Sequence, residues 1–132
     1  MNIVVLVNER PEGRAALDWA LLNGIHLPSV NDDPVVHVVH ESTGDSLARP
    51  SYISPALTEE ITAQLRAAGV KHEIHSTPAD PAARVIDLAV DTAAELVVIG
   101  MRRRSPTLKL IVGSHAQRIM LDAPCPVVGV KE

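Results

Sequence analysis

Two glycines and a serine near the carboxyl end of the chain have types and spacing suited to binding an anion. A short apolar run, Leu96–Ile99, ends at Gly100, and Gly113 stands directly before Ser114, where a helix is expected to begin. Glycines let a backbone approach a ligand closely, and the N–H groups at a helix start attract anions. The pattern predicts a phosphate-binding arrangement and therefore a nucleotide ligand. If the segment does not bind phosphate, we expect a protein interaction module on the same scaffold.

A basic loop lies between the two glycines. It reads Arg102-Arg-Arg-Ser-Pro106, and Lys109 follows it closely. Guanidinium groups bind phosphate oxygens through paired hydrogen bonds, so Arg102 and Arg103 are candidate phosphate ligands. The alternative is a solvated loop that keeps the protein soluble. Because the loop directly follows the strand-terminal Gly100, both interpretations stay open.

The sequence lacks the common motifs of nucleotide-handling and hydrolytic enzymes. It has neither the Gly-x4-Gly-Lys-Ser/Thr pattern nor the Gly-x-Gly-x-x-Gly pattern, and it has no Gly-x-Ser-x-Gly elbow. Ser114 and His115 are adjacent, and adjacent helical residues do not face each other, so they are not expected to act as nucleophile and base. We expect no catalytic residue and no enzymatic main role, although slow hydrolysis of a bound nucleotide is compatible with the sequence.

Histidines occur in pairs within two expected strands. His37 and His40 are three residues apart, as are His72 and His75. An odd separation in a strand points side chains to opposite faces, so neither pair is expected to chelate one ion. We predict ordinary histidines at strand ends and no metal site.

Length and charge limit the classes of function. The chain has 132 residues and a formal net charge of −4, which indicates a single domain over 1–132 and argues against general binding to nucleic acid. The apolar start, Met1–Val7, lacks a basic region and a cleavage site, so it is predicted to be a strand. No apolar run approaches the roughly 20 residues of a membrane span. We expect a cytoplasmic protein without a membrane partner.

Strands and helices are expected to alternate along the chain. The short β-branched runs predicted as strands are Ile3–Val7, Val35–His40, Val70–His75, Leu96–Ile99 and Val127–Val130. The segments with apolar residues at helical spacing are Gly13–Leu22, Pro55–Ala68, Pro81–Ala94 and Ser114–Leu121. Ser54 and Asp80 are predicted N-caps before a proline, and Gly69 is a predicted helix stop.

This alternation predicts an α/β fold: a three-layer α/β/α sandwich with a five-stranded, mainly parallel sheet of the Rossmann-like kind. Ligands of such sheets bind outside the carboxyl ends of the strands, near the point where the strand order reverses. The residues expected at that edge are 8–10, 38–41, 76–80 and 100–105, completed by Gly113 and Ser114.

Several segments, in order, resemble the universal stress protein family over nearly the whole chain. They are Ile3-Val-Val-Leu-Val-Asn8 with Gly13-Arg-Ala-Ala-Leu-Asp-Trp-Ala20, then His37-Val38, Asp80-Pro-Ala82, Glu95-Leu-Val-Val-Ile-Gly100 and Pro124-Cys-Pro-Val-Val-Gly-Val-Lys131. The resemblance implies a fold like that of the adenine nucleotide alpha hydrolases. It also implies a homodimeric stress-response sensor or regulator that binds ATP or AMP. Mg²⁺ would come only with the nucleotide, held mostly by its phosphates.

The chain departs from the family pattern at two positions. Members that bind ATP carry Gly-x2-Gly-x9-Gly-Ser/Thr; Gly100, Gly113 and Ser114 match it, and Arg103 replaces the second glycine. Arg103 either blocks the approach of the backbone to phosphate or contacts the phosphate itself. Asn8 stands where the family usually has Asp, which keeps one acceptor oxygen, removes the charge and adds donors.

The resemblance implies a set of nucleotide-binding residues. Val38 would contact adenine with its backbone, Ile99 would line the pocket, and protonated His115 would contact phosphate. The whole implied set is Val7, Asn8, Val38, Ile99, Gly100, Arg102, Arg103, Gly113, Ser114 and His115.

The last expected strand is the predicted dimer contact. Family members commonly pair through it, and Val127, Val128 and Val130 give it an apolar edge without a protecting charge before Lys131. The alternative function is a universal stress protein that binds no nucleotide and acts as a protein interaction module. An adenylating enzyme is not supported, because 8–11 is not the Ser-Gly-Gly type of phosphate loop.

Overall fold

A computed structural model describes residues 1–29, 33–41, 55–75, 80–101 and 113–131. Strands and helices alternate through these ranges, as the sequence predicts. The strands are β1 (Asn2–Val7), β2 (Val35–His40), β3 (Lys71–His75), β4 (Leu96–Met101) and β5 (Val127–Lys131). The helices are α1 (Pro11–Leu22), the 3-10 turn η1 (Gly24–His26), α2 (Pro55–Ala67), α3 (Pro81–Asp91) and α4 (Ser114–Asp122).

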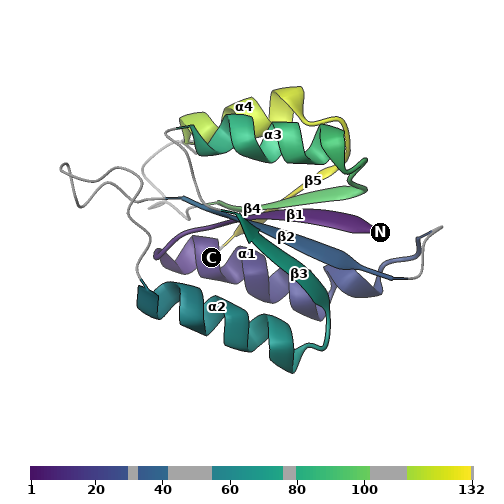
Figure 1. Cartoon of the computed structure of the whole chain (residues 1–132). Coiled ribbons are helices and arrows are strands. Elements are labelled where there is room, and N and C mark those ends of the chain that lie inside the picture. The colour runs from purple at the N-terminus through teal and green to yellow at the C-terminus, as the bar shows by residue number, and fades with distance from the viewer. Residues whose placement is uncertain (30–32, 42–54, 76–79, 102–112, 132) are drawn as a thin grey trace.

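The five strands form one parallel sheet in the order β3-β2-β1-β4-β5. The chain first adds strands on one side of β1, then crosses to its other side after β3. Right-handed crossovers in opposite directions place their helices on opposite faces of the sheet. Helices α1 and α2 therefore cover one face and α3 and α4 the other (Figure 1). The predicted three-layer α/β/α sandwich with a parallel sheet is confirmed.

Two aliphatic cores separate the layers. Ile3, Val5 and Val7 of β1 pack with α1 and α2, and Val4 and Leu6 pack with the layer of α3 and α4. The central strand is thus buried on both faces, which explains its unbroken apolar sequence. Among the described residues, none of the helices combines the length and the apolar character needed to cross a bilayer.

The ends of the helices follow local chemistry. Asp80 caps α3 by accepting a hydrogen bond from the Ala83 amide at 3.1 Å, as predicted. Gly69, with φ +66°, follows α2 in the left-handed conformation expected of a stop. The expected cap Ser54 lies outside the described residues.

Helix α3 ends at Asp91, three residues before the predicted end at Ala94. The Thr92 hydroxyl donates to the Leu88 carbonyl at 2.6 Å, and Ala93 has φ 50°. A left-handed residue cannot continue a right-handed helix, so the apolar spacing runs past the true end. The other boundaries match the prediction or differ by at most two residues; α1, for example, begins at Pro11 instead of Gly13.

Candidate functional site

The strand order reverses between β1 and β4, and in open parallel sheets a ligand crevice forms at the carboxyl ends of the strands at such a point. β1 lies between β2 and β4, and the helices that follow these two strands, α1 after β1 and α4 after β4, lie on opposite faces of the sheet. Ligands of open parallel sheets bind at such a point because the diverging loops leave room there. The residues that follow β1 and β2, and the start of α4, therefore form the candidate site.

Asn8 uses both ends of its side-chain amide. Its Nδ2 donates to Glu41 Oε2 at 3.1 Å, and its Oδ1 accepts from the Arg10 amide at 2.9 Å. Asn8 is buried, with 9% of its surface exposed. Glu41 is held as well, because its amide donates to the Val7 carbonyl at 2.7 Å. Asparagine suits this position, since an aspartate would place two carboxylates against each other.

Glu41 also connects the sheet to α4. Its Oε1 lies 2.5 Å from His115 Nδ1, while its Oε2 accepts from Asn8. His115 is in the first turn of α4, directly after the exposed Gly113 and Ser114. The contact holds the amino-terminal end of α4 over the ends of β1 and β2. We call Asn8, Glu41 and His115 the crevice cluster.

An exposed ion pair lies beside this cluster. Arg118 NH1 donates to Asp80 Oδ2 at 2.5 Å and so joins α4 to the cap of α3. The Arg118 hydrogen bond, followed by that of the Ala83 amide, holds the pKa of Asp80 below its usual value. Asp80 therefore stays ionised and paired with Arg118 at neutral pH. Arg118 is three residues from His115, which places both on one side of α4.

The structure brings some of the predicted site residues together and separates others. Asn8 and His115 meet through Glu41, next to Gly113 and Ser114. Val38 lies within β2, between Val5 of β1 and Ile74 of β3, and its side chain is buried. Val7 and Ile99 are buried in the cores on opposite faces of the sheet. Arg102 and Arg103 lie outside the described residues.

Gly100 has a packing role in addition to its predicted role. A Cβ at this position would lie 2.0 Å from the Glu12 carbonyl oxygen in the first turn of α1. A backbone atom cannot move aside as a flexible side chain can, so α1 can approach β4 only because residue 100 is glycine. At Gly113, by contrast, a Cβ would meet no described atom within 4 Å. With respect to the described residues, the start of α4 is therefore open at Gly113.

Glu41 is a residue of the candidate site to which the sequence assigned no role of its own. The range 38–41 was expected at the ligand edge, but the charge that bridges β1 and α4 was not assigned a role. Its position directly after an apolar strand was the available indication. The pairing of Asp80 with Arg118 had no comparable indication, because it depends on the placement of α3 against α4.

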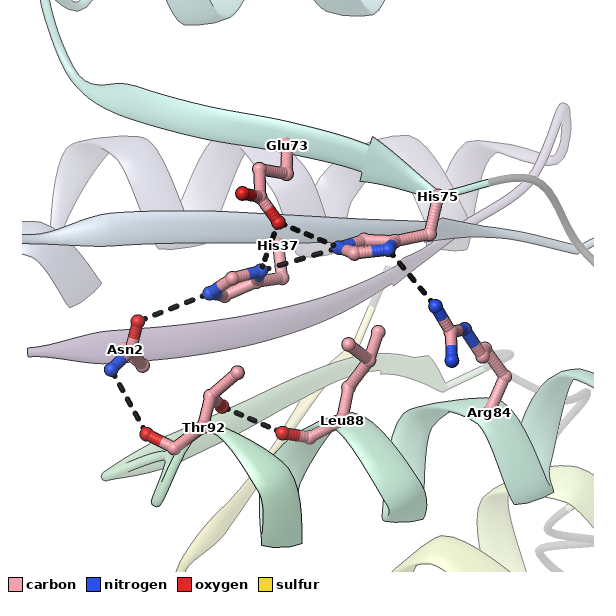
Figure 2. A network of polar contacts seen from close by, with 7 residues as sticks. All are labelled: Asn2, His37, Glu73, His75, Arg84, Leu88 and Thr92. Carbon is pink, nitrogen blue, oxygen red and sulfur yellow. Dashed lines mark hydrogen bonds and ion pairs between the residues drawn. The ribbon is translucent and has the colours of Figure 1, made fainter.

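A second polar cluster lies on β2 and β3, on the face covered by α3 (Figure 2). His37, Glu73 and His75 bring one nitrogen or oxygen each to within 4.8 Å of one another. We call these residues the edge cluster, since β3 is the edge strand. Among the described residues, the edge cluster is the group of three histidine, cysteine or acidic side chains whose ligand atoms lie close enough together to hold one metal ion.

Comparisons with known proteins agree on one family. The model of the universal stress protein family matches residues 1–131. A universal stress protein of Mycolicibacterium smegmatis is 35% identical over 130 residues, which cover 98% of this chain and 96% of that protein. A universal stress protein structure from Archaeoglobus fulgidus is 29% identical, with a TM-score of 0.71 and coverage of 99% and 98%. A structure of the Archaeoglobus protein with dAMP, at 24% identity and a TM-score of 0.64, covers 99% and 98% and is similar in fold.

Proposed function

The chain belongs to the universal stress protein family, and from that premise we propose that it binds an adenine nucleotide between the crevice cluster and the start of α4. The observation that carries the proposal is the His115–Glu41 contact. It holds the amino-terminal end of α4 at the point where the strand order reverses. A helix start at such a point offers its N–H groups to a phosphate. The complex of a related structure with dAMP supports the same ligand class.

Each residue of the proposed site has a separate task. The amides at Gly113 and Ser114 would bind phosphate, because their helix start is exposed and nothing described crowds Gly113. His115 would exchange its contact with Glu41 for a contact with a phosphate oxygen, which is an acceptor of the same kind. Asn8 would present its amide to the nucleoside. Mg²⁺ would enter with the nucleotide phosphates.

We propose a binding and regulatory role, with little hydrolysis. Two acids described beside the crevice are already engaged: Glu41 with Asn8 and His115, and Asp80 with Arg118 and the Ala83 amide. A general base needs a carboxylate within reach of the attacking water, and these contacts occupy both carboxylates.

Calorimetric titration of nucleotide-stripped protein with Mg·ATP tests the site. We expect saturable binding near one nucleotide per chain, weaker heats with GTP, and loss of binding in Gly113→Val. The valine side chain would occupy the open space at the helix start. Glu59→Val is the matched control, because Glu59 is exposed on α2, on the other face of the sheet. Unchanged affinity in a folded Gly113→Val variant would remove the proposed site.

We also propose that two copies pair through β5. This strand has a neighbour on one side only within the described sheet, and Val127, Val128 and Val130 are half-buried. Val97 donates to the Pro126 carbonyl at 3.0 Å, so the amide of Val127, one residue on, points away from β4. We expect a dimer in sedimentation equilibrium and a monomer for Val127→Pro, which removes that amide. A wild-type chain that stays monomeric as its concentration rises would exclude the pairing.

A further inference from the structure

The edge cluster is assembled across two strands. In the parallel register His37 of β2 lies opposite Glu73 of β3, and Val39 lies opposite His75. His37, Glu73 and His75 therefore share one face of the sheet, beneath α3 (Figure 2). Within a single strand the odd spacing of the histidines places their side chains on opposite faces. Across β2 and β3, however, His37 and His75 lie on the same face and come together.

Three atoms of the cluster form a nearly equilateral triangle. His37 Nδ1 is 3.3 Å from His75 Nε2, Glu73 Oε2 is 3.5 Å from His37 Nδ1, and Glu73 Oε2 is 3.4 Å from His75 Nε2. Tetrahedral zinc holds nitrogen and oxygen ligands at about 2.0–2.1 Å, which separates neighbouring ligands by about 3.3–3.4 Å. We propose that these three atoms bind one Zn²⁺ ion, with water as the fourth ligand.

The surroundings fix His37 as a ligand. The Asn2 amide nitrogen donates to the Thr92 carbonyl at 3.0 Å, so Asn2 Oδ1 is the atom that faces His37 Nε2 at 3.0 Å. That oxygen can only accept, and His37 must carry its proton on Nε2. The Nδ1 lone pair is then directed at the triangle. Metal-binding histidines are commonly oriented by such an acceptor on the other ring nitrogen.

His75 is held by a different partner. Arg84 NH2 of α3 lies 3.2 Å from His75 Nδ1, and a guanidinium can only donate, so Nδ1 accepts and Nε2 carries the proton. In the metal-free protein this Nε2–H faces the His37 Nδ1 lone pair. Zinc needs the Nε2 lone pair, so the ring proton must move to Nδ1. An Nδ1–H cannot accept from Arg84, and zinc binding therefore displaces Arg84.

The site is reachable and ready for a cation. Glu73 lies on the edge strand with 63% of its side chain exposed, while the His37 and His75 side chains are 7% and 15% exposed. Burial lowers the pKa of both imidazoles against the effect of Glu73, and Arg84 lowers that of His75 further. The contacts with Asn2, Arg84 and the neighbouring ring leave one proton on each imidazole, which is the neutral form that metal ligation requires. The positive charge of Arg84 repels a bound cation, so Arg84 must leave His75 when Zn²⁺ binds.

Titration of the chelator-treated, tag-free chain with Zn²⁺ tests the proposal. We expect one ion per chain by calorimetry, and Co²⁺ should give the intense visible absorption of a tetrahedral site. Glu73→Gln should weaken Zn²⁺ binding by more than the ~100-fold that marks the loss of an outer partner. Because Glu73 is exposed, this variant should fold even if His37 and His75 variants do not. His72→Ala is the matched control, since His72 is on the same strand but points to the other face.

Arg84→Gln separates this site from adventitious binding to surface histidines. Removing a cation next to the metal relieves Coulomb repulsion, so Zn²⁺ should bind at least about tenfold more tightly. In ¹⁵N spectra of the ring nitrogens, Zn²⁺ should move the His75 proton from Nε2 to Nδ1. Equal Zn²⁺ affinity in wild type, Glu73→Gln and His72→Ala would overturn the site, and unchanged affinity in Arg84→Gln would overturn the displacement. Nucleotide binding does not enter either result.

Discussion

The crevice cluster and the edge cluster are both built from histidine and glutamate, but they are assembled in different ways. Asn8 and Glu41 directly follow β1 and β2, and His115 is in the first turn of α4, so the crevice cluster lies at the ends of elements. His37, Glu73 and His75 lie within strands and meet through the register of β2 and β3. The contacts of the crevice cluster join the loop edge of the sheet to a helix start, and those of the edge cluster join two strands under α3. The first suits a ligand that enters at the strand ends, and the second suits an ion.

The largest expected effect is at the glycine that positions the crevice. In Gly100→Ala the added Cβ would lie 2.0 Å from the Glu12 carbonyl oxygen, so β4 and α1 must separate. Overpacking of this kind should lower the free energy of unfolding by about 3 kcal/mol, measured by urea denaturation. Gly113→Ala is the control, with a loss of about 1 kcal/mol from a poorer N-cap. Equal losses in the two variants would contradict the packing role of Gly100. The Zn²⁺ affinity of the edge cluster should be unchanged in both Gly100→Ala and Gly113→Ala.

A smaller effect is expected when a second charge enters the crevice. Asn8→Asp would replace the donor that faces Glu41 Oε2 at 3.1 Å with a carboxylate. At pH 7 the free energy of unfolding should fall by about 2 kcal/mol, since a charged hydrogen bond is lost and a like charge gained. The repulsion raises one carboxyl pKa above its unfolded value, so the folded state binds more protons and the loss shrinks as the pH falls.

The double variant Asn8→Asp/Glu41→Gln tests whether the loss comes from this pair. The side-chain amide of the introduced glutamine can donate to the introduced aspartate, so most of the lost stability should return at pH 7. If the double variant is as unstable as Asn8→Asp alone, the contact between residues 8 and 41 does not govern the crevice.

The smallest effect concerns a histidine that belongs to neither cluster. His40 is 2% exposed, and neither of its ring nitrogens has a hydrogen-bond partner in the part of the chain that the structure describes. Burial lowers its pKa below 6.5, although the charges of Glu9 and Glu41 raise it. The unfolded chain therefore binds more protons below pH 6.5, and stability falls as the pH falls from that value toward the pKa in the folded state.

His40→Leu should remove this contribution. At pH 7.5 the variant should be as stable as the wild type or more so, because an unpaired polar ring is replaced by an apolar side chain. Below pH 6.5 the free energy of unfolding of the variant should fall less steeply with falling pH than that of the wild type. The two slopes should differ by no more than about 1.4 kcal/mol per pH unit. Identical pH profiles from thermal denaturation would show that His40 has a partner that stabilises its charged form.

Much of the fold could be predicted because strands and helices have local patterns. The strand Val35–His40 was predicted with its observed bounds, and Asp80 caps α3 as its position before Pro81 indicates. The end of α3 was predicted too late, since the left-handed Ala93 has no sequence pattern of its own. Local sequence patterns therefore predict which elements form, whereas the end of an element can depend on the conformation of one residue such as Ala93.

Reasoning from strand ends reaches only part of the candidate site. Asn8 was expected at the ligand edge because parallel strands share one carboxyl edge, and His115 was expected from the family resemblance alone, whereas Glu41 needed the observed contact to gain a role. The edge cluster escaped prediction because its residues meet through the pairing of two strands, and no spacing within one strand encodes that register. The packing role of Gly100 depends in the same way on the approach of α1.

The central place of β1 has a consequence for the order in which the protein forms. Ile3 pairs with Val36 on one side and with Leu96 on the other. During synthesis the β2 side of β1 can close early, but the other side stays without its neighbour until β4 has left the ribosome. At about 5–20 residues per second that interval lasts several seconds. A long-range closure of this kind is slow in refolding as well, because distant segments must meet first. A strand that is buried on both faces of the finished sheet therefore lacks one of its two neighbours for much of the synthesis.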